Sequence, residues 1–210
     1  MIFHNDSNRS QVIEEFFQAY QEKLCSVLQQ YSWCNVAVLA RALSIVSKEN
    51  KQVFLCGNGG SAGNAIHLAN DFLFGVRTGL GKGLRVEALA ANPAVLTCLA
   101  NDIGYEEIFS YQVQEKSNPG DILLVLSGSG NSPNIIRALE VGNELDLKTF
   151  AILGYSGGRC KSLAHHPIHF EIDDMQIAED LQLIVGHMCM QWLCDSNNQE
   201  QESGVKRYSK

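Results

Sequence analysis

Between residues 51 and 194 the chain alternates five short apolar or β-branched runs with stretches of helical character. Strands that alternate with helices at this spacing form right-handed βαβ units, which build a parallel sheet with helices on both faces. The sequence therefore predicts an α/β fold with a doubly wound, five-stranded parallel sheet. The expected strands are 53–56, 84–89, 122–126, 149–153 and 168–172, and the expected helices are 62–73, 93–101, 133–145, 158–164 and 176–193.

The segments on either side of this region have different patterns. Residues 1–50 contain two amphipathic stretches without glycine or proline, which predict a pair of helices. The apolar face around Phe16 and Phe17 is broader than one small sheet can cover, which favours self-association. The last residues are polar and lack periodicity. We therefore expect oligomerisation helices in 1–50, the sheet domain in 51–194 and a flexible tail in 195–210.

Charge and cysteine usage exclude several classes of function. The chain has 16 basic and 23 acidic residues, a net charge of −7, which does not support a general surface for nucleic acid or for anionic membranes. Its apolar runs are much shorter than the ~20 residues that cross a bilayer. Seven cysteines without a CxxC pair, in a chain without an apolar leader, favour reduced thiols and a cytoplasmic location.

Two glycine-rich turns connect an expected strand to the helix that follows it. The first is Gly57-Asn58-Gly59-Gly60-Ser61 and the second is Ser127-Gly128-Ser129-Gly130-Asn131-Ser132. Glycines let an anion approach the backbone, hydroxyls donate hydrogen bonds, and the free amides at a helix start add positive potential. Neither turn has the lysine of a nucleotide P-loop or the GxGxxG spacing of a dinucleotide fold. They indicate a phosphate monoester, although one such turn alone can be a plain tight connection.

These motifs resemble those of a known family. The strings CGNGGS and LSGSGNSPNIIRA, with an N-terminal helical pair and a last long helix, are similar to the sugar isomerase (SIS) fold, and most similar to its phosphoheptose isomerase group. The resemblance covers about residues 11–193. It implies a flavodoxin-like SIS fold, a homotetramer packed through its N-terminal helices, and conversion of sedoheptulose 7-phosphate to D-glycero-D-manno-heptose 7-phosphate for bacterial lipopolysaccharide or capsule.

Two histidines and two carboxylates form a candidate metal site. His67 and Asp71 are four residues apart in one expected helix, and Glu179 and His187 are eight apart in the last one, so each pair can share a helix face. This donor set suits a divalent ion such as zinc. The resemblance implies zinc at these four positions, with Asp71 where a glutamate is expected and Glu179 where a glutamine is expected. Taken singly, each residue could also be a core histidine or a solvated charge.

The resemblance also assigns roles. It implies Asp71 as the catalytic base and His187 as the acid of an aldose–ketose isomerase. Gly128 stands where a threonine is expected. The Asn101-Asp102 pair matches a substrate-binding turn, although it could simply end a helix. The expected substrate-binding residues are Asn58, Gly59, Gly60, Ser61, Asn101, Asp102, Ser127, Gly128, Ser129, Ser132 and Glu179.

Two other functions remain open at this stage. A non-catalytic SIS binding module, of the DnaA initiator-associating type, would keep the fold without the histidines and acids. A sugar-phosphate sensor would keep the serine turn and tolerate a damaged acid–base pair. In each case the expected ligands are a sugar phosphate or further copies of the chain, and neither nucleic acid nor membrane.

Overall fold

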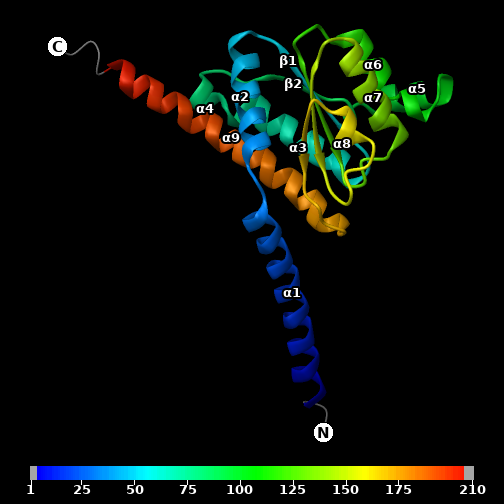
Figure 1. Cartoon of the computed structure of the whole chain (residues 1–210), viewed down its shortest axis with the longest axis vertical. Coiled ribbons are helices and arrows are strands. Elements are labelled where there is room, and N and C mark those ends of the chain that lie inside the picture. The colour runs from blue at the N-terminus through cyan, green and yellow to red at the C-terminus, as the bar shows by residue number, and fades with distance from the viewer. Residues whose placement is uncertain (1–3, 206–210) are drawn as a thin grey trace. The chain divides into compact units, whose positions relative to one another are not determined.

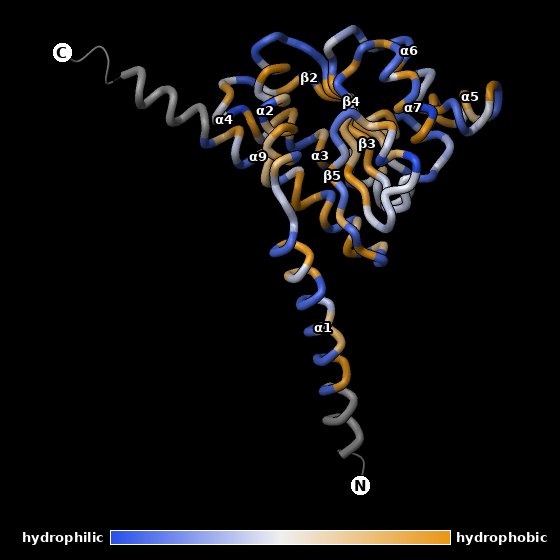
Figure 2. The backbone as a smooth tube through the Cα atoms, in the orientation of Figure 1, coloured by the Kyte–Doolittle hydropathy of each residue, from blue (hydrophilic) through white to orange (hydrophobic). Residues whose placement is uncertain are grey.

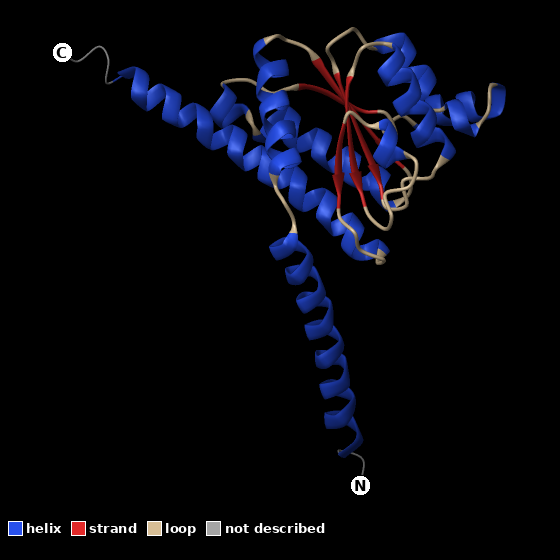
Figure 3. Cartoon of the chain, viewed as in Figure 1, coloured by secondary structure: helices blue, strands red, loops and turns tan. Residues whose placement is uncertain are grey.

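A computed structural model describes the backbone of residues 4–205 and the side chains of residues 10–195. It contains one five-stranded sheet in the order β2-β1-β3-β4-β5, in which every neighbouring pair is parallel. Figure 3 shows these strands in red, enclosed by helices. The predicted doubly wound α/β fold is confirmed. The strands are β1 (Gln52–Gly57), β2 (Arg85–Ala88), β3 (Ile122–Ser127), β4 (Lys148–Leu153) and β5 (His166–His169).

The two faces of the sheet are covered by different helices (Figure 1). Alternate side chains of β1, Phe54 and Cys56, pack into a core with α7, while Val53 and Leu55 are buried on the other side, where α2, α3 and α9 lie. All six residues of β3 are buried because the strand lies in the middle of the sheet. The helices of this region are α2 (Cys34–Lys48), α3 (Gly60–Asn70), α4 (Arg77–Leu80), α5 (Pro93–Asp102), α6 (Ser110–Lys116), α7 (Pro133–Glu144), α8 (Cys160–Leu163) and α9 (Met175–Val205), with a 3-10 turn η2 at Tyr105–Glu107.

Three boundaries differ from the expected ones. The helix expected over 62–73 ends as an α-helix at Asn70 and continues as a π-helical turn, η1 (Asp71–Gly75), in which the Val76 amide bonds the Asp71 carbonyl. The last strand lies at His166–His169 rather than at 168–172. Helix α9 runs to Val205, past the point where a tail was expected, and residues 206–210 of that expected tail lie outside the described residues.

The chain divides into two compact units, Met1–Ser32 and Trp33–Lys210. The second expected helix, α2, therefore belongs with the sheet, whereas a boundary after residue 50 was expected. The first unit holds α1 (His4–Gln30), in which apolar and hydrophilic residues alternate along the helix (Figure 2). Phe16 is 70% exposed and Phe17 is 63% exposed. Among the described residues, none of the helices combines the length and hydropathy that a bilayer crossing requires.

Thiol labelling tests the placement of the core. Burial raises the pKa of Cys56, and it raises the pKa values of Cys160 and Cys189 to about 12. Because the thiolate is the reactive form, these three cysteines should stay unlabelled by Ellman's reagent at pH 8 until the protein is unfolded in denaturant. Exposed Cys25 is the internal control and should react in the folded protein. Rapid labelling of the three buried thiols in the folded state would contradict the fold.

Candidate active site

Helices α3 and α9 lie side by side, and their contact organises the site. A side chain on Gly186 would overlap Leu68 of α3, so the absence of one lets the helices approach closely. Buried Gln182 donates from Nε2 to Ser61 Oγ (3.0 Å). Asn64 Nδ2 donates to Gln182 Oε1 (3.0 Å) and to the Glu179 carbonyl (2.9 Å). Gly60 lies against Glu179 at the start of this contact and His67 lies against His187 further along, so the two helices run parallel in a fixed register.

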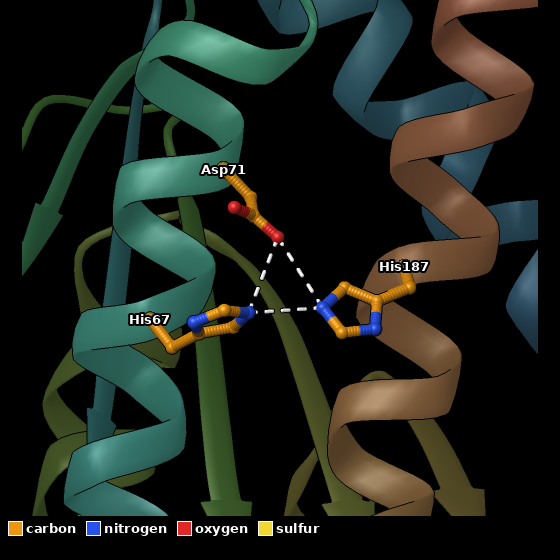
Figure 4. A group of neighbouring side chains, drawn as sticks. All are labelled: His67, Asp71 and His187. Atoms are coloured by element: carbon orange, nitrogen blue, oxygen red, sulfur yellow. Dashed lines mark hydrogen bonds and ion pairs between the residues drawn. The ribbon is translucent and has the colours of Figure 1, made fainter.

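This contact brings three of the four expected metal ligands together (Figure 4). The Nε2 atoms of His67 and His187 are 3.0 Å apart. Asp71 Oδ2 lies 3.4 Å from the first of these nitrogens and 3.3 Å from the second. The side chain of His67 is 48% exposed and that of His187 is 42% exposed, so the group is open to solvent.

The geometry of this group fits a divalent cation. Two imidazole nitrogens and a carboxylate oxygen converge within 4.8 Å of one another, and three protein ligands leave a coordination position for a substrate oxygen. Histidine nitrogen with carboxylate oxygen suits a borderline ion such as zinc. Asp71 is the first residue of the π-helical turn. In this turn, an amide bonds the carbonyl five residues earlier instead of the carbonyl four residues earlier.

Glu179, which was expected as a fourth ligand, is not among these converging residues in the structure. The group of converging ligand atoms comprises His67, Asp71 and His187. Glu179 lies eight residues before His187 on α9, more than two turns away, and its side chain points to the start of α3 instead.

A pocket of about 280 Å³ lies where the two glycine turns meet. Parallel strands bring their carboxyl ends to one edge of the sheet, and the turns after β1 and β3 are neighbours there because the strands are paired. Of the eleven expected substrate-binding residues, nine line the pocket, together with Leu126 and Met175. The nine are Asn58, Gly59, Gly60, Ser61, Ser127, Gly128, Ser129, Ser132 and Glu179.

The serines of the second turn keep hydroxyl donors for a ligand. Ser127 Oγ accepts from the Gly130 amide (3.1 Å) and Ser129 Oγ accepts from the Asn131 amide (3.3 Å), so each O–H group remains available. Ser132 precedes α7, and its hydroxyl makes no hydrogen bond within the described residues. Ser61 of the first turn is also buried, and its hydroxyl accepts a hydrogen bond from Gln182 of α9, so its O–H group remains available too.

Asn58 is held by two residues, Asn134 and Tyr105, that no sequence pattern indicated. Its side-chain amide pairs reciprocally with that of fully buried Asn134, at 2.8 and 2.9 Å. The Tyr105 hydroxyl donates to Asn58 Oδ1 (3.2 Å). These partners occupy the Asn58 oxygen and one of its two N–H donors, which leaves one donor for a ligand. No sequence spacing links residues 58, 105 and 134, because only the fold brings them together.

Two expected substrate-binding residues lie elsewhere. Asn101 and Asp102 are exposed at the end of α5, where Asn101 Nδ2 donates to Asp102 Oδ1 (2.7 Å), and neither lines the pocket. This position agrees with the alternative that the pair ends a helix. At Gly128, where a threonine was expected, Met175 Sδ lies 2.6 Å from the point where a side chain would begin, so the flexible end of Met175 occupies that space.

Comparisons with known proteins agree with this geometry. The sequence profile of the SIS domain matches residues 15–154. The chain belongs to the SIS domain family. It is 36% identical to the phosphoheptose isomerase of Crocosphaera subtropica over 81% of this chain and 82% of the relative. It is 34% identical to that of Helicobacter pylori strain P12 over 88% and 93%.

A solved structure supports the SIS fold. The phosphoheptose isomerase of Neisseria gonorrhoeae superposes with a TM-score of 0.79 over 86% of this chain and 98% of that chain, at 24% sequence identity. The resemblance to the phosphoheptose isomerase group that the glycine turns indicated is therefore confirmed for the family and for the fold.

The close approach of α3 and α9 can be tested by substitution. Gly186→Ala inserts a methyl group against Leu68 and should lower the free energy of unfolding by about 1–3 kcal/mol. By separating His67 from His187, it should also weaken zinc binding measured by competition with a chromogenic chelator. Gly63→Ala is the matched control, because open space surrounds Gly63, and it should leave zinc affinity unchanged. Equal zinc affinity in both variants would contradict this account of the site.

Proposed function

We propose that this SIS protein is a phosphoheptose isomerase that interconverts sedoheptulose 7-phosphate and D-glycero-D-manno-heptose 7-phosphate. The observation that carries the proposal is the pairing of an anion pocket with a His–Asp–His group on the same two parallel helices. From Gly60 to His67 the helix rises roughly 10 Å, at 1.5 Å per residue. This separation is comparable with the length of an extended seven-carbon sugar phosphate, so one ligand can reach both places.

The phosphate end of the substrate is held by neutral groups. The hydroxyls of Ser127, Ser129 and Ser132 donate to phosphate oxygens, and the first amides of α7 add the positive potential of a helix N-terminus. Binding energy from this distant end positions the reacting carbons at the other end of the ligand.

The isomerisation itself needs a base, an acid and stabilisation of the developing oxyanion. Asp71 Oδ2 faces the two imidazoles. Asp71 Oδ1, which also accepts a hydrogen bond from Asn70 Nδ2 (3.4 Å), takes a proton from the carbon next to the carbonyl and returns it at the neighbouring carbon. His187 exchanges the proton of the carbonyl oxygen through Nδ1, because its Nε2 faces His67 and Asp71. His67, Asp71 and His187 would hold the zinc ion, and a bound zinc ion supplies Lewis acidity that polarises the substrate carbonyl.

A non-catalytic binding module would not need this arrangement. Its surface could keep the fold without two histidines and an aspartate that converge on one point. A sensor of sugar phosphates would keep the pocket and show no turnover, so an activity assay separates it from the isomerase. As an isomerase, the protein would act in the cytoplasm and supply heptose for a bacterial surface glycan.

Metal removal and one substitution test the catalytic proposal. Purified protein should contain about one divalent ion per chain, and treatment with a chelator should abolish turnover of sedoheptulose 7-phosphate until zinc is restored. Asp71→Asn keeps the size of the side chain and removes its basicity, so kcat should fall by about 10²–10⁴-fold. Asp173→Asn, at an exposed position before α9, is the control and should keep full activity. Full turnover of the chelated protein or of Asp71→Asn would refute the mechanism.

The proposal includes a homotetramer. The exposed apolar residues of α1 support it, because Val12, Ile13, Phe16 and Phe17 are all more than half exposed and lie on one face of the helix. Light scattering at micromolar concentration should give the mass of four 23.1 kDa chains. The double variant Phe16→Asp, Phe17→Asp should lower that mass, whereas a monomeric wild-type protein would contradict the proposal.

A further inference from the structure

Glu179 brings a negative charge into a pocket that is otherwise lined by hydroxyl, amide and apolar groups. It lies on the second turn of α9 and lines the pocket together with the serine turn. A side chain at residue 60 would overlap both carboxylate oxygens of Glu179, so the carboxylate lies directly over Gly60, the first residue of α3.

No positive side chain balances this carboxylate. Lysine and arginine are absent from the pocket lining, and within the described residues no ion pair or side-chain hydrogen bond involves the Glu179 carboxylate. The favourable interaction in its place is with the N-terminus of α3. The first amides of a helix lack intrahelical acceptors and carry a partial positive charge. The chain therefore places its own anion at one of the two helix starts in the pocket.

The second helix start, at α7, has no such anion. Ser132 precedes it, and its hydroxyl has no partner among the described residues, while Ser127 and Ser129 keep O–H donors. An incoming phosphate is consequently repelled at the α3 end and attracted at the α7 end. Hydroxyl groups have the opposite preference, because a carboxylate is a strong hydrogen-bond acceptor for them.

We propose that Glu179 determines the direction in which the sugar phosphate lies in the pocket. Its carboxylate excludes phosphate from the start of α3 and accepts hydrogen bonds from sugar hydroxyls there, so the phosphate binds at the Ser127–Ser132 turn. The ligand class rests on the proposed function. His67 lies further along α3, and Asp71 follows α3 in η1, so this direction points the polyol and carbonyl end of the ligand toward them.

Inorganic phosphate is the direct probe of this charge, because it has no sugar to orient. Glu179→Gln keeps the shape over Gly60 and removes the charge. Calorimetric titration should show a phosphate Kd about tenfold lower in Glu179→Gln than in the wild type. Glu171→Gln removes one acidic charge at an exposed position just before α9 and should change the phosphate Kd less than twofold.

Turnover separates exclusion of phosphate from recognition of hydroxyls. In Glu179→Gln the phosphate Kd should fall about tenfold, whereas the KM for sedoheptulose 7-phosphate should not fall. The ratio of phosphate Kd to KM should therefore drop about tenfold. Glu179→Met has neither charge nor hydroxyl acceptor. It should bind phosphate as tightly as Glu179→Gln does and should have a KM severalfold above the wild-type value. This second variant keeps the test available if the glutamine variant folds poorly.

Two results would overturn the proposal. One is a phosphate Kd in both Glu179 variants within twofold of the wild type. The other is an equal decrease in Glu171→Gln, which would indicate net charge rather than position. The phosphate titration needs no turnover. A wild-type protein that binds phosphate but does not isomerise sedoheptulose 7-phosphate would refute the proposed function while leaving the phosphate comparison between variants valid.

Discussion

The close contact between α3 and α9 is the constraint on which the site depends. Gly186 allows the approach, and buried Gln182 fixes the register by bonding both Ser61 and Asn64. Because the helices run parallel, one register sets two distances at once. It places Glu179 over the start of α3 and brings His187 to His67 two turns later. The anion pocket and the metal-binding group therefore depend on the same contact between α3 and α9, and a shift of either helix would disturb both.

The pocket shows how a chain with a net charge of −7 can bind an anion. The overall field of the protein does not attract phosphate, so recognition depends on short-range groups: hydroxyls, backbone amides and helix starts. Such groups discriminate by position, since their influence falls off within a few ångströms. The single carboxylate of Glu179, at the start of α3, is then enough to determine which way a sugar phosphate lies in the pocket.

Local patterns predicted most of the fold, and long-range contacts account for what they missed. The strands and the anion turns could be read from sequence because each depends on a short continuous stretch. His67, Asp71 and His187 were identifiable by helical spacing together with a family resemblance. The position of Glu179 depends on a contact with Gly60 across 119 residues, and Asn58 depends on Tyr105 and Asn134. Periodicity within one helix cannot specify such pairings.

The π-helical turn at Asp71 has a consequence for the phase of the helix. Before it, α3 turns by about 100° per residue and keeps its contact face toward α9. The wider turn holds about one residue more than an α-helical turn, so the helix changes phase between Asp71 and Gly75. Asp71 stands at the junction of the two phases. Moving the junction by one residue would therefore change the direction in which the Asp71 carboxylate points relative to His67 and His187.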